Sequence, residues 1–279
     1  YLPRPLVGMF EGAEDGFSPN QVAGALLYVL PLAISLTVAA VLRRSTAAVL
    51  GLVAVLAMGL VFVATQSRAG LAGLAVAVLV MLLLPQRTGR WVLAVLGFVL
   101  FCALLFLPVG PWLLQLDAGT RADAVEGGIN MAGRFEIWER ALRGIHDFPL
   151  TGMGLGTFRE MIRPLYPLFS VPPSFDIAHA HNFFLQVALD FGVFGLIMVV
   201  SMYFVAGWEA RELWYSRAFD GSTAVAIGLI GCLMGQTVYS LADAVTMGSK
   251  PNLLFWYLLA LIVGTARWRL YLQQRSQMT

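Results

Sequence analysis

A chain of 279 residues in which 59% are hydrophobic and only 12% are charged cannot cover a globular surface with polar groups, because soluble domains carry about 25% charged residues. The mean hydropathy of +0.78 agrees, so lipid must be the solvent for much of the chain. The net charge of +2 gives no reason to expect nucleic acid as a partner.

The apolar runs are long and unbroken, which predicts membrane helices. In lipid every backbone N–H and C=O must be paired within its own segment or within a closed barrel, and barrel strands would appear as short alternating segments. About 20 apolar residues cross a bilayer, and the third and seventh runs are short. The expected helices cover residues 21–42, 46–64, 69–84, 91–108, 183–207, 222–242 and 252–267.

Four further features complete the sequence interpretation. Pro31 is expected to kink the first helix. The spacings Gly228-x-x-Gly231-x-x-x-Gly235 and Ala69-x-x-x-Gly73-x-x-x-Ala77 predict close helix packing. Residues 1–20 lack a basic region followed by an apolar one, so we predict no signal peptide and expect a longer protein upstream. The thiols Cys102 and Cys232 lie in apolar runs and indicate no disulfide.

The arginines and lysines of the short loops predict the orientation. One side has nine basic residues and the other has three, so the first side is cytoplasmic. The nine are Arg43, Arg44, Arg87, Arg90, Arg211, Arg217, Arg267, Arg269 and Arg275, and the three are Arg4, Arg68 and Lys250. We therefore expect membrane helices in residues 1–108, a large periplasmic loop over 109–182, and membrane helices with a cytoplasmic tail in 183–279.

Local patterns indicate that this loop is partly helical. Residues 133–146 place Phe135, Trp138, Leu142 and Ile145 on one face of a helix. A second helix is expected to begin at Thr157, where Thr157-x-x-Glu160 has the spacing of a capping box. Gly152, Gly154 and Gly156 predict a turn between the two helices, and a phosphate-cradling loop is the weaker alternative because no strand precedes them.

The loop also holds the residues that point to chemistry. All three histidines, His146, His179 and His181, lie in it with six arginines, and a histidine among arginines suits base catalysis on an anionic substrate. For Arg140, Arg143, Arg159 and Arg163 we expect solvated charges or contacts with lipid headgroups instead of a catalytic role. Arg68 lies in a tight turn between two apolar runs, where a charge indicates either function or snorkelling to the headgroups.

Three stretches resemble the O-antigen ligase and polymerase family of bacterial envelope glycosyltransferases: Gly133-Arg134-Phe135-Glu136-Ile137-Trp138, Pro149-Leu150-Thr151-Gly152-Met153-Gly154 and Ala180-His181-Asn182-Phe183-Phe184-Leu185. His181-Asn182 is followed after nine residues by Gly192-x-x-Gly195, which is similar to that family's signature at the end of the loop. Ser67-Arg68-Ala69-Gly70 and Pro19-Asn20-x-x-Ala23 resemble two further family motifs.

The resemblance implies an all-α, GT-C-like transferase in the bacterial inner membrane, with its active site at the periplasmic face and no cofactor. Its donor would be a glycan on undecaprenyl diphosphate, and its acceptor lipid A-core, a growing glycan or a protein, with lipid A-core as the first choice. His181 matches the family's essential histidine, and Arg68 and Arg134 match its essential arginines. Asn182 and His179 are expected to help bind the substrate. A small-solute transporter is the competing function.

The chemistry expected from these residues is a direct displacement. His181 would take a proton from the acceptor hydroxyl while Arg68 and Arg134 hold the charge of the leaving diphosphate. Asp176 is the only carboxylate near His181 in sequence, and a retaining mechanism would want two, so we expect inversion.

Two further expectations concern carboxylates. Neither a helix nor a strand would bring Asp176, His179 and His181 together, so we predict no metal site. Asp190 is half a turn out of phase with His181 and is expected to pair with a basic or amide group of another helix.

Overall fold

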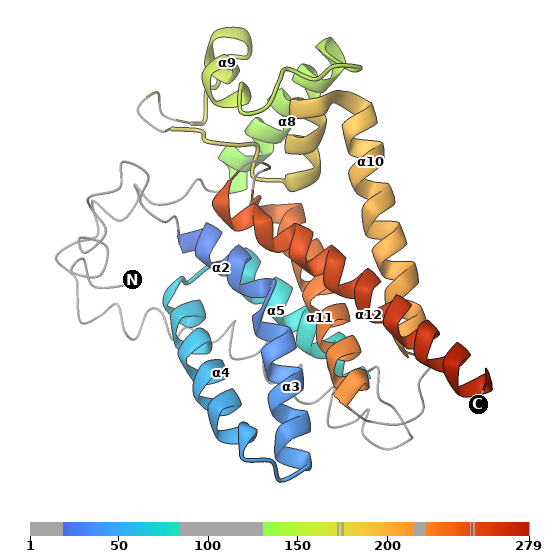
Figure 1. Ribbon diagram of the computed structural model, residues 1–279. Helices are drawn as coiled ribbons and strands as arrows, with labels where there is room; N and C mark the ends of the chain where they lie inside the picture. The colour runs from blue at the N-terminus through green and yellow to red at the C-terminus, as the bar shows by residue number, and fades with distance from the viewer. Residues whose placement is uncertain are drawn as a thin grey trace, which may run out of the picture.

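The computed structural model describes residues 19–83, 131–171, 173, 176–214, 221–245, 247 and 249–278, and these residues contain helices and loops but no strand (Figure 1). The helices are α2 (Pro19–Leu27), α3 (Leu30–Leu42), α4 (Ala47–Ala64), α5 (Arg68–Leu83), α8 (Met131–Asp147), α9 (Phe158–Leu165), α10 (Phe183–Trp214), α11 (Gly221–Ala242), the 3₁₀ turn η2 (Lys250–Asn252) and α12 (Leu253–Met278). The expected all-α class is confirmed.

Several helices of the described chain are long and apolar enough to cross a bilayer. Four qualify by length and hydropathy: α4, Phe183–Ala210 of α10, Thr223–Ala242 of α11 and Leu253–Leu272 of α12. The pair α2 and α3 makes a fifth span if the bend between them lies within one crossing. The chain is therefore a multi-pass helical membrane protein. The helix expected at 91–108 lies outside the described residues.

The first expected helix is broken rather than merely kinked. α2 ends at Leu27 and α3 begins at Leu30, and their axes differ by 44°. Proline lacks the N–H that would bond to the carbonyl four residues earlier, and its ring clashes with that carbonyl. Since Leu27 lies four residues before Pro31, the proline explains where α2 stops.

Two of the later helices extend further than the apolar runs suggest. α10 reaches Trp214 and α12 reaches Met278, whereas the sequence placed their ends at 207 and 267. Each helix continues past its first charged residues, where hydropathy falls but helix propensity does not. α10 is also interrupted at Gly192, whose φ of 69° and ψ of −169° are not helical.

Small residues let α5 and α11 pack backbone against backbone, as their spacing predicted. A Cβ atom on Gly73 would lie 2.6 Å from the carbonyl oxygen of Gly235, and one on Gly235 would lie 2.9 Å from that of Gly73. Such close approach is how helices associate in lipid, where apolar side chains gain little from leaving the solvent. α4 contrasts with this pair, because most of its apolar side chains are exposed among the described residues.

α8 and α9 lie together at one end of the bundle, above the start of α10 and the junction of α11 with α12 (Figure 1). The helical character of α8 was predicted, but its buried face was not. Ile137 and Ala141 are fully buried, whereas Phe135 and Leu142 are more than half exposed. α8 packs on α10 through small residues, since a Cβ atom on Gly144 would lie 2.9 Å from Leu189 Cδ2.

Candidate active site

The start of α10 is joined to the end of α11 by one asparagine. The side-chain oxygen of Asn182 accepts hydrogen bonds from the backbone N–H groups of Phe184, at 3.0 Å, and Leu185, at 3.1 Å. This is an N-cap, which satisfies amides that the first turn leaves unpaired. Its Nδ2 donates to the carbonyl of Leu241 at 3.0 Å. Asn182 thus holds the residue before it, His181, beside the end of α11; direct contact of Asn182 with substrate stays a prediction.

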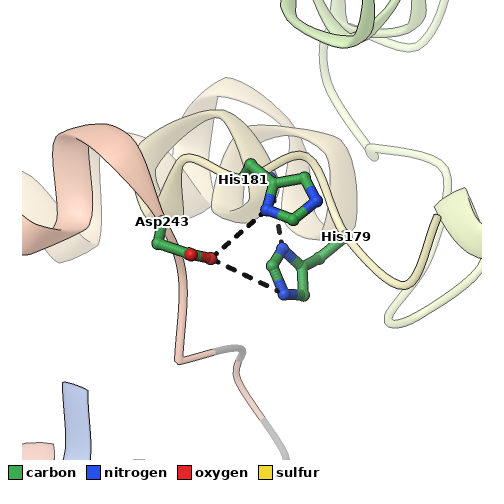
Figure 2. Close-up of side chains that lie close together, drawn as sticks. All are labelled: His179, His181 and Asp243. Atoms are coloured by element: carbon green, nitrogen blue, oxygen red, sulfur yellow. Dashed lines mark hydrogen bonds and ion pairs between the residues drawn. The ribbon is translucent and has the colours of Figure 1, made fainter. Parts of the chain in front are cut away.

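His179 and His181 lie next to Asp243, the first residue after α11 (Figure 2). His181 Nδ1 is 3.4 Å from Asp243 Oδ1, and His179 Nε2 is 3.9 Å from the same oxygen. The two imidazole rings contact each other edge to face with centroids 4.5 Å apart. Because a carboxylate oxygen only accepts, Asp243 holds the Nδ1 proton of His181 and leaves Nε2 as the basic nitrogen.

His179 is a neutral neighbour of His181. Its Nδ1 accepts the backbone N–H of His181 at 3.1 Å, so its own proton is on Nε2 and points toward Asp243. Burial and the electrostatic interaction with His181 lower the pKa of His179 to about 4, although Asp243 acts in the opposite direction. His179 therefore presents an uncharged wall to His181 at neutral pH and fixes the backbone of the next histidine.

The backbone of His181 is held in an unusual conformation. Its φ is +48°, in the left-handed region that non-glycine residues rarely adopt. Such a conformation costs about 1–3 kcal/mol and persists only where surrounding contacts determine it. The hydrogen bond to His179 and the adjacent Asn182 cap supply those contacts.

Asp243 is a buried carboxylate that stays ionised. Its side chain is 1% exposed, and burial alone would raise its pKa. The hydrogen bond with His181, the electrostatic interactions with both imidazoles and the N–H of Ala244, at 2.9 Å, outweigh burial and lower the pKa. Oδ2 is buried without a hydrogen-bond partner among the described residues, which leaves one acceptor atom facing the site.

Arg134 of α8 reaches the same carboxylate. Its Nη2 is 3.6 Å from Asp243 Oδ2, and its Nη1 donates to the carbonyl of Ala242. The Arg134 side chain is only 15% exposed. The structure thus brings Arg134 and His181 together through Asp243, forming a chain of base, carboxylate and cation contributed by three separate segments.

Arg68 lies apart from the series of contacts formed by His181, Asp243 and Arg134. It is the first residue of α5 and is exposed, with no hydrogen bond or ion pair of its side chain among the described residues. Ser67 caps this helix, because its hydroxyl accepts the N–H of Gly70 at 3.2 Å. Gly70 in turn packs on Ala23 of α2. The structure does not bring Arg68 into contact with His181 or Arg134, and its role stays a prediction.

The acid that contacts His181 is not the one that sequence proximity suggested. Asp176 forms a two-point ion pair with Arg159, whose Nε is 2.9 Å from Asp176 Oδ1. Asp243 takes its place although it lies 62 residues beyond His181. One sequence feature could have identified Asp243: it is an acidic residue directly after the sixth apolar run, at the end of that run that lies on the same side of the membrane as the loop.

One group of three metal-ligand side chains occurs among the described residues, and it differs from the trio considered above. His179, His181 and Asp243 place one ligand atom each within 4.8 Å of one another. A metal ion needs an unprotonated nitrogen, but the bond that His179 Nδ1 accepts leaves the proton on Nε2. Arg134 also presents its positive charge to the same carboxylate. The contacts fit a proton-transfer site better than a metal centre.

The glycine-rich segment 149–156 supports α10 instead of forming an anion cradle. It docks at the break in that helix, where Met153 N–H donates to the carbonyl of Leu189 at 2.6 Å and Val193 N–H to that of Pro149 at 2.8 Å. A Cβ atom on Gly152 would lie 2.6 Å from the nitrogen of Gly192. Two stretches of the family resemblance thus form a single contact.

The capping box expected at Thr157 is not formed. The Thr157 hydroxyl donates to the carbonyl of Met153 at 2.7 Å, and Thr157 itself is helical rather than extended. The hydroxyl is oriented toward the carbonyls of Met153 and Gly154 in the preceding turn, and it makes no capping hydrogen bond to the helix that follows. α9 begins at Phe158, one residue after the expected start, and its first turn is closed by the N–H groups of Glu160 and Met161, which donate to the Thr157 carbonyl.

Asp190 accepts hydrogen bonds from amide groups, as expected, but neither amide belongs to another helix. Its Oδ1 accepts from Nε2 of Gln186 in α10 at 2.8 Å and from the backbone N–H of Gly156 at 3.2 Å. It makes no hydrogen bond to His181 among the described contacts, in line with the phase argument.

Comparison with known proteins places this geometry in a family. The model of the O-antigen ligase family matches residues 53–200, which is more than half of the chain. The chain is also similar to "Teichuronic acid biosynthesis protein TuaE" of Bacillus subtilis (strain 168), with 25% identity over 216 residues. That match covers 75% of this chain but 42% of the relative, so the chain spans less than half of the relative's length. The chain belongs to the O-antigen ligase family.

Proposed function

We propose that this protein transfers a glycan from undecaprenyl diphosphate to a hydroxyl acceptor at the periplasmic face of the bacterial inner membrane. The observation that carries the proposal is the chain His181–Asp243–Arg134, in which an ionised buried acid lies between an imidazole and a guanidinium. A base with a fixed tautomer next to a cation suits the transfer of a proton from a hydroxyl attacking an anionic donor.

In the proposed reaction, His181 Nε2 takes the proton of the acceptor hydroxyl while its oxygen bonds to the anomeric carbon. The bond from that carbon to the phosphate oxygen breaks, and the diphosphate leaves with the electron pair. Asp243 holds Nδ1–H and stabilises the imidazolium that forms. One displacement inverts the anomeric centre, and a single carboxylate already engaged by a guanidinium and an imidazole supports this over a double displacement.

The two arginines receive different tasks in this proposal. Arg134 already donates to Ala242 and faces Asp243, so it contributes positive charge from a fixed position. Arg68 is exposed and its fork makes no described contact, so it is the side chain suited to a bidentate grip on the diphosphate. Because the arginines would supply the positive charge that stabilises the leaving diphosphate, the proposed reaction needs no metal ion or cofactor.

Lipid A-core is our first candidate acceptor, which would make the protein a ligase in lipopolysaccharide biosynthesis. Polymerisation of a glycan chain is the second, and it is favoured by the relative named for teichuronic acid biosynthesis. Transfer to a protein hydroxyl is the third. A transporter is disfavoured because the segments that carry the site, α8, the start of α10 and the end of α11, meet at one end of the bundle (Figure 1), whereas transporter sites lie near the bilayer midplane.

The decisive experiment uses the full-length protein in lipid nanodiscs with an undecaprenyl-diphosphate-linked glycan. Lipid A-core and a lipid-linked glycan are offered as separate acceptors, and products are identified by mass spectrometry and by the NMR coupling at the new anomeric carbon. We expect an inverted linkage to one acceptor, with undiminished yield in excess chelator. No transfer to either acceptor would contradict the proposal, and loss of activity in chelator that one added metal restores would replace the arginine mechanism.

The orientation can be tested on the exposed part of the outer region. Phe169 is 84% exposed, so a cysteine there should react with a thiol reagent that does not cross the inner membrane. Labelling only after cell lysis would place the site on the cytoplasmic side.

A further inference from the structure

Two polar side chains of α10 are buried near the site without taking part in the proposed chemistry. Gln186 and Asp190 are each 3% exposed, in a helix that is otherwise apolar enough to span a membrane. Ionisable groups in such a helix are expensive and need partners. Packing alone would be served by apolar side chains, so the contacts of this pair must explain their presence.

The pair connects two backbone segments through consecutive hydrogen bonds. Ala180 N–H donates to Gln186 Oε1 at 2.8 Å, and Gln186 Nε2 donates to Asp190 Oδ1 at 2.8 Å. Gly156 N–H donates to the same oxygen of Asp190 at 3.2 Å. The glycine segment at the break of α10 is therefore linked to the peptide between His179 and His181.

The donor and acceptor roles in this series of hydrogen bonds are fixed at both of its ends. Ala180 and Gly156 each supply a backbone N–H, which can only donate. Ala180 therefore requires the oxygen of Gln186, and this turns the amide nitrogen of Gln186 toward Asp190. A carboxylate with two incoming donors fits that place, whereas an apolar residue would let the Gln186 amide rotate and leave the Ala180 N–H buried without an acceptor.

Ala180 connects this series of hydrogen bonds to the proposed base, His181. It is fully buried between the two histidines, and His181 directly after it has a left-handed backbone. A left-handed residue keeps its position only while its neighbours hold it. Release of the Ala180 N–H would shift the His181 ring relative to Asp243, whose oxygen is 3.4 Å away.

We propose that Gln186 and Asp190 are positioning residues for His181: they anchor the Ala180 peptide to the glycine segment and thereby set the distance between the imidazole and Asp243. This inference rests on the proposed function, because it treats His181 as the base. Neither residue touches the reacting atoms. Their loss should lower the rate of the chemical step and leave donor affinity nearly unchanged.

The test compares Q186L, D190L and D190N with wild type in the full-length protein in nanodiscs. A misplacement of about 1 Å can cost about 10²-fold, so we expect Q186L and D190L to lose about that factor in kcat while KM stays within about twofold. D190N should recover most of the rate, because its amide oxygen can accept from Gly156 and Gln186. Hydrogen exchange of a peptide spanning 179–182 should become faster in Q186L and D190L but not in D190N.

The matched control is S35A, which removes another buried hydrogen bond, from Ser35 Oγ to the carbonyl of Ala224 at 2.6 Å between α3 and α11. It should lower thermal stability without changing kcat per folded molecule. Q186L and D190L with wild-type kcat, or with the same exchange at 179–182 as S35A, would overturn the inference. If D190L does not fold, Q186L decides the question.

The two proposals fail in different ways. If wild type transfers no glycan, the proposed function fails, whereas faster exchange at 179–182 in Q186L would still support the positioning of this segment. If wild type is active and H181A is not, but Q186L and D190L behave like S35A, the positioning role alone is refuted.

Discussion

The outer region, from α8 to the start of α10, and the α5–α11 core of the bundle are held together in different ways. In the outer region single side chains secure irregular backbone: Glu136 accepts the N–H groups of Phe169, at 2.7 Å, and Ser170, at 2.6 Å, and Arg140 Nε donates to the carbonyl of Pro167 at 3.0 Å. In the bundle core it is the lack of side chains at Gly73 and Gly235 that brings the helices together.

The difference follows from what each backbone needs. Loop N–H and C=O groups have no helical partners, so a specific side chain must supply each one. Membrane helices satisfy their own backbones and associate by close packing instead. Removing a side chain should therefore damage function in the outer region, and adding one should damage stability in the bundle. Four predictions test this contrast, beginning with the largest effect.

The largest effect is expected at the proposed base. H181A should lower the transfer rate by about 10²–10⁴-fold, as for the loss of one general base, and D243N should approach this loss because it disturbs the Nδ1 proton of His181. Both proteins should remain folded. H146A is the control, since the His146 side chain is 89% exposed, and it should keep nearly full activity. Equal losses in H181A and H146A would refute the assignment of the base.

The second-largest loss of transfer rate is expected when the arginines are replaced, measured in steady-state kinetics with a lipid-linked donor. R68A should cost about 10²–10³-fold, the usual effect of removing one donor to a developing anion. R68K and R134K should also lose most of their turnover, because a lysine is a point donor and cannot reproduce the guanidinium fork. Retention of most turnover in both lysine variants would reduce these residues to general electrostatics or lipid anchoring.

The third prediction concerns stability against pH in the outer region. The folded pKa of His179 is about 4, below the unfolded value of 6.5. Between these values the unfolded chain binds a proton that the folded protein does not, so stability falls as pH drops from 6.5 to 4, by up to about 3 kcal/mol. H179Q should lack this part of the decline in thermal unfolding scans. Equal slopes for wild type and H179Q would contradict the burial of a neutral imidazole.

The smallest effect tests the bundle. G73V should destabilise the protein by about 1–3 kcal/mol, the cost of overpacking a close contact, because a Cβ atom there meets the Gly235 carbonyl oxygen at 2.6 Å. G59V on α4 is the matched control, since a Cβ atom there meets no described atom within 4 Å. Thermal unfolding in one detergent compares the two. Activity per folded molecule should be unchanged in both, and equal stability losses would remove the distinction between packed and lipid-facing glycines.

Sequence reasoning succeeded where one segment determines its own structure. The apolar runs predicted α4, α5, α10 and α11 to within two residues at their starts, because hydropathy and helix formation are local properties. The packing role of Gly73 and Gly235 was also predictable, since small residues at helical spacing have few other uses in lipid.

Prediction from the sequence was incomplete where the site depends on contacts between residues far apart in the chain. Asp243 and His181 are 62 residues apart, and no local pattern links an acid after α11 to a histidine before α10. The buried face of α8 was misassigned because hydrophobicity favoured Phe135 and Leu142, whereas packing on α10 required the small Gly144. The hydroxyl of Thr157 had two possible partners, and the glycine turn before it decided which one it uses.

The break of α10 at Gly192 has a consequence for biosynthesis. It leaves Leu189 C=O and Val193 N–H without helical partners, and the outer segment supplies them through Met153 N–H and the Pro149 carbonyl. An unsatisfied backbone group costs several kcal/mol where lipid excludes water. Residues 149–153 precede α10 in the sequence and are synthesised first, so the segment that completes the break exists before the helix that needs it. The order of the motifs along the chain thus makes the partner segment before the broken helix, and a permuted gene that encodes α10 first would produce the helix before its partner.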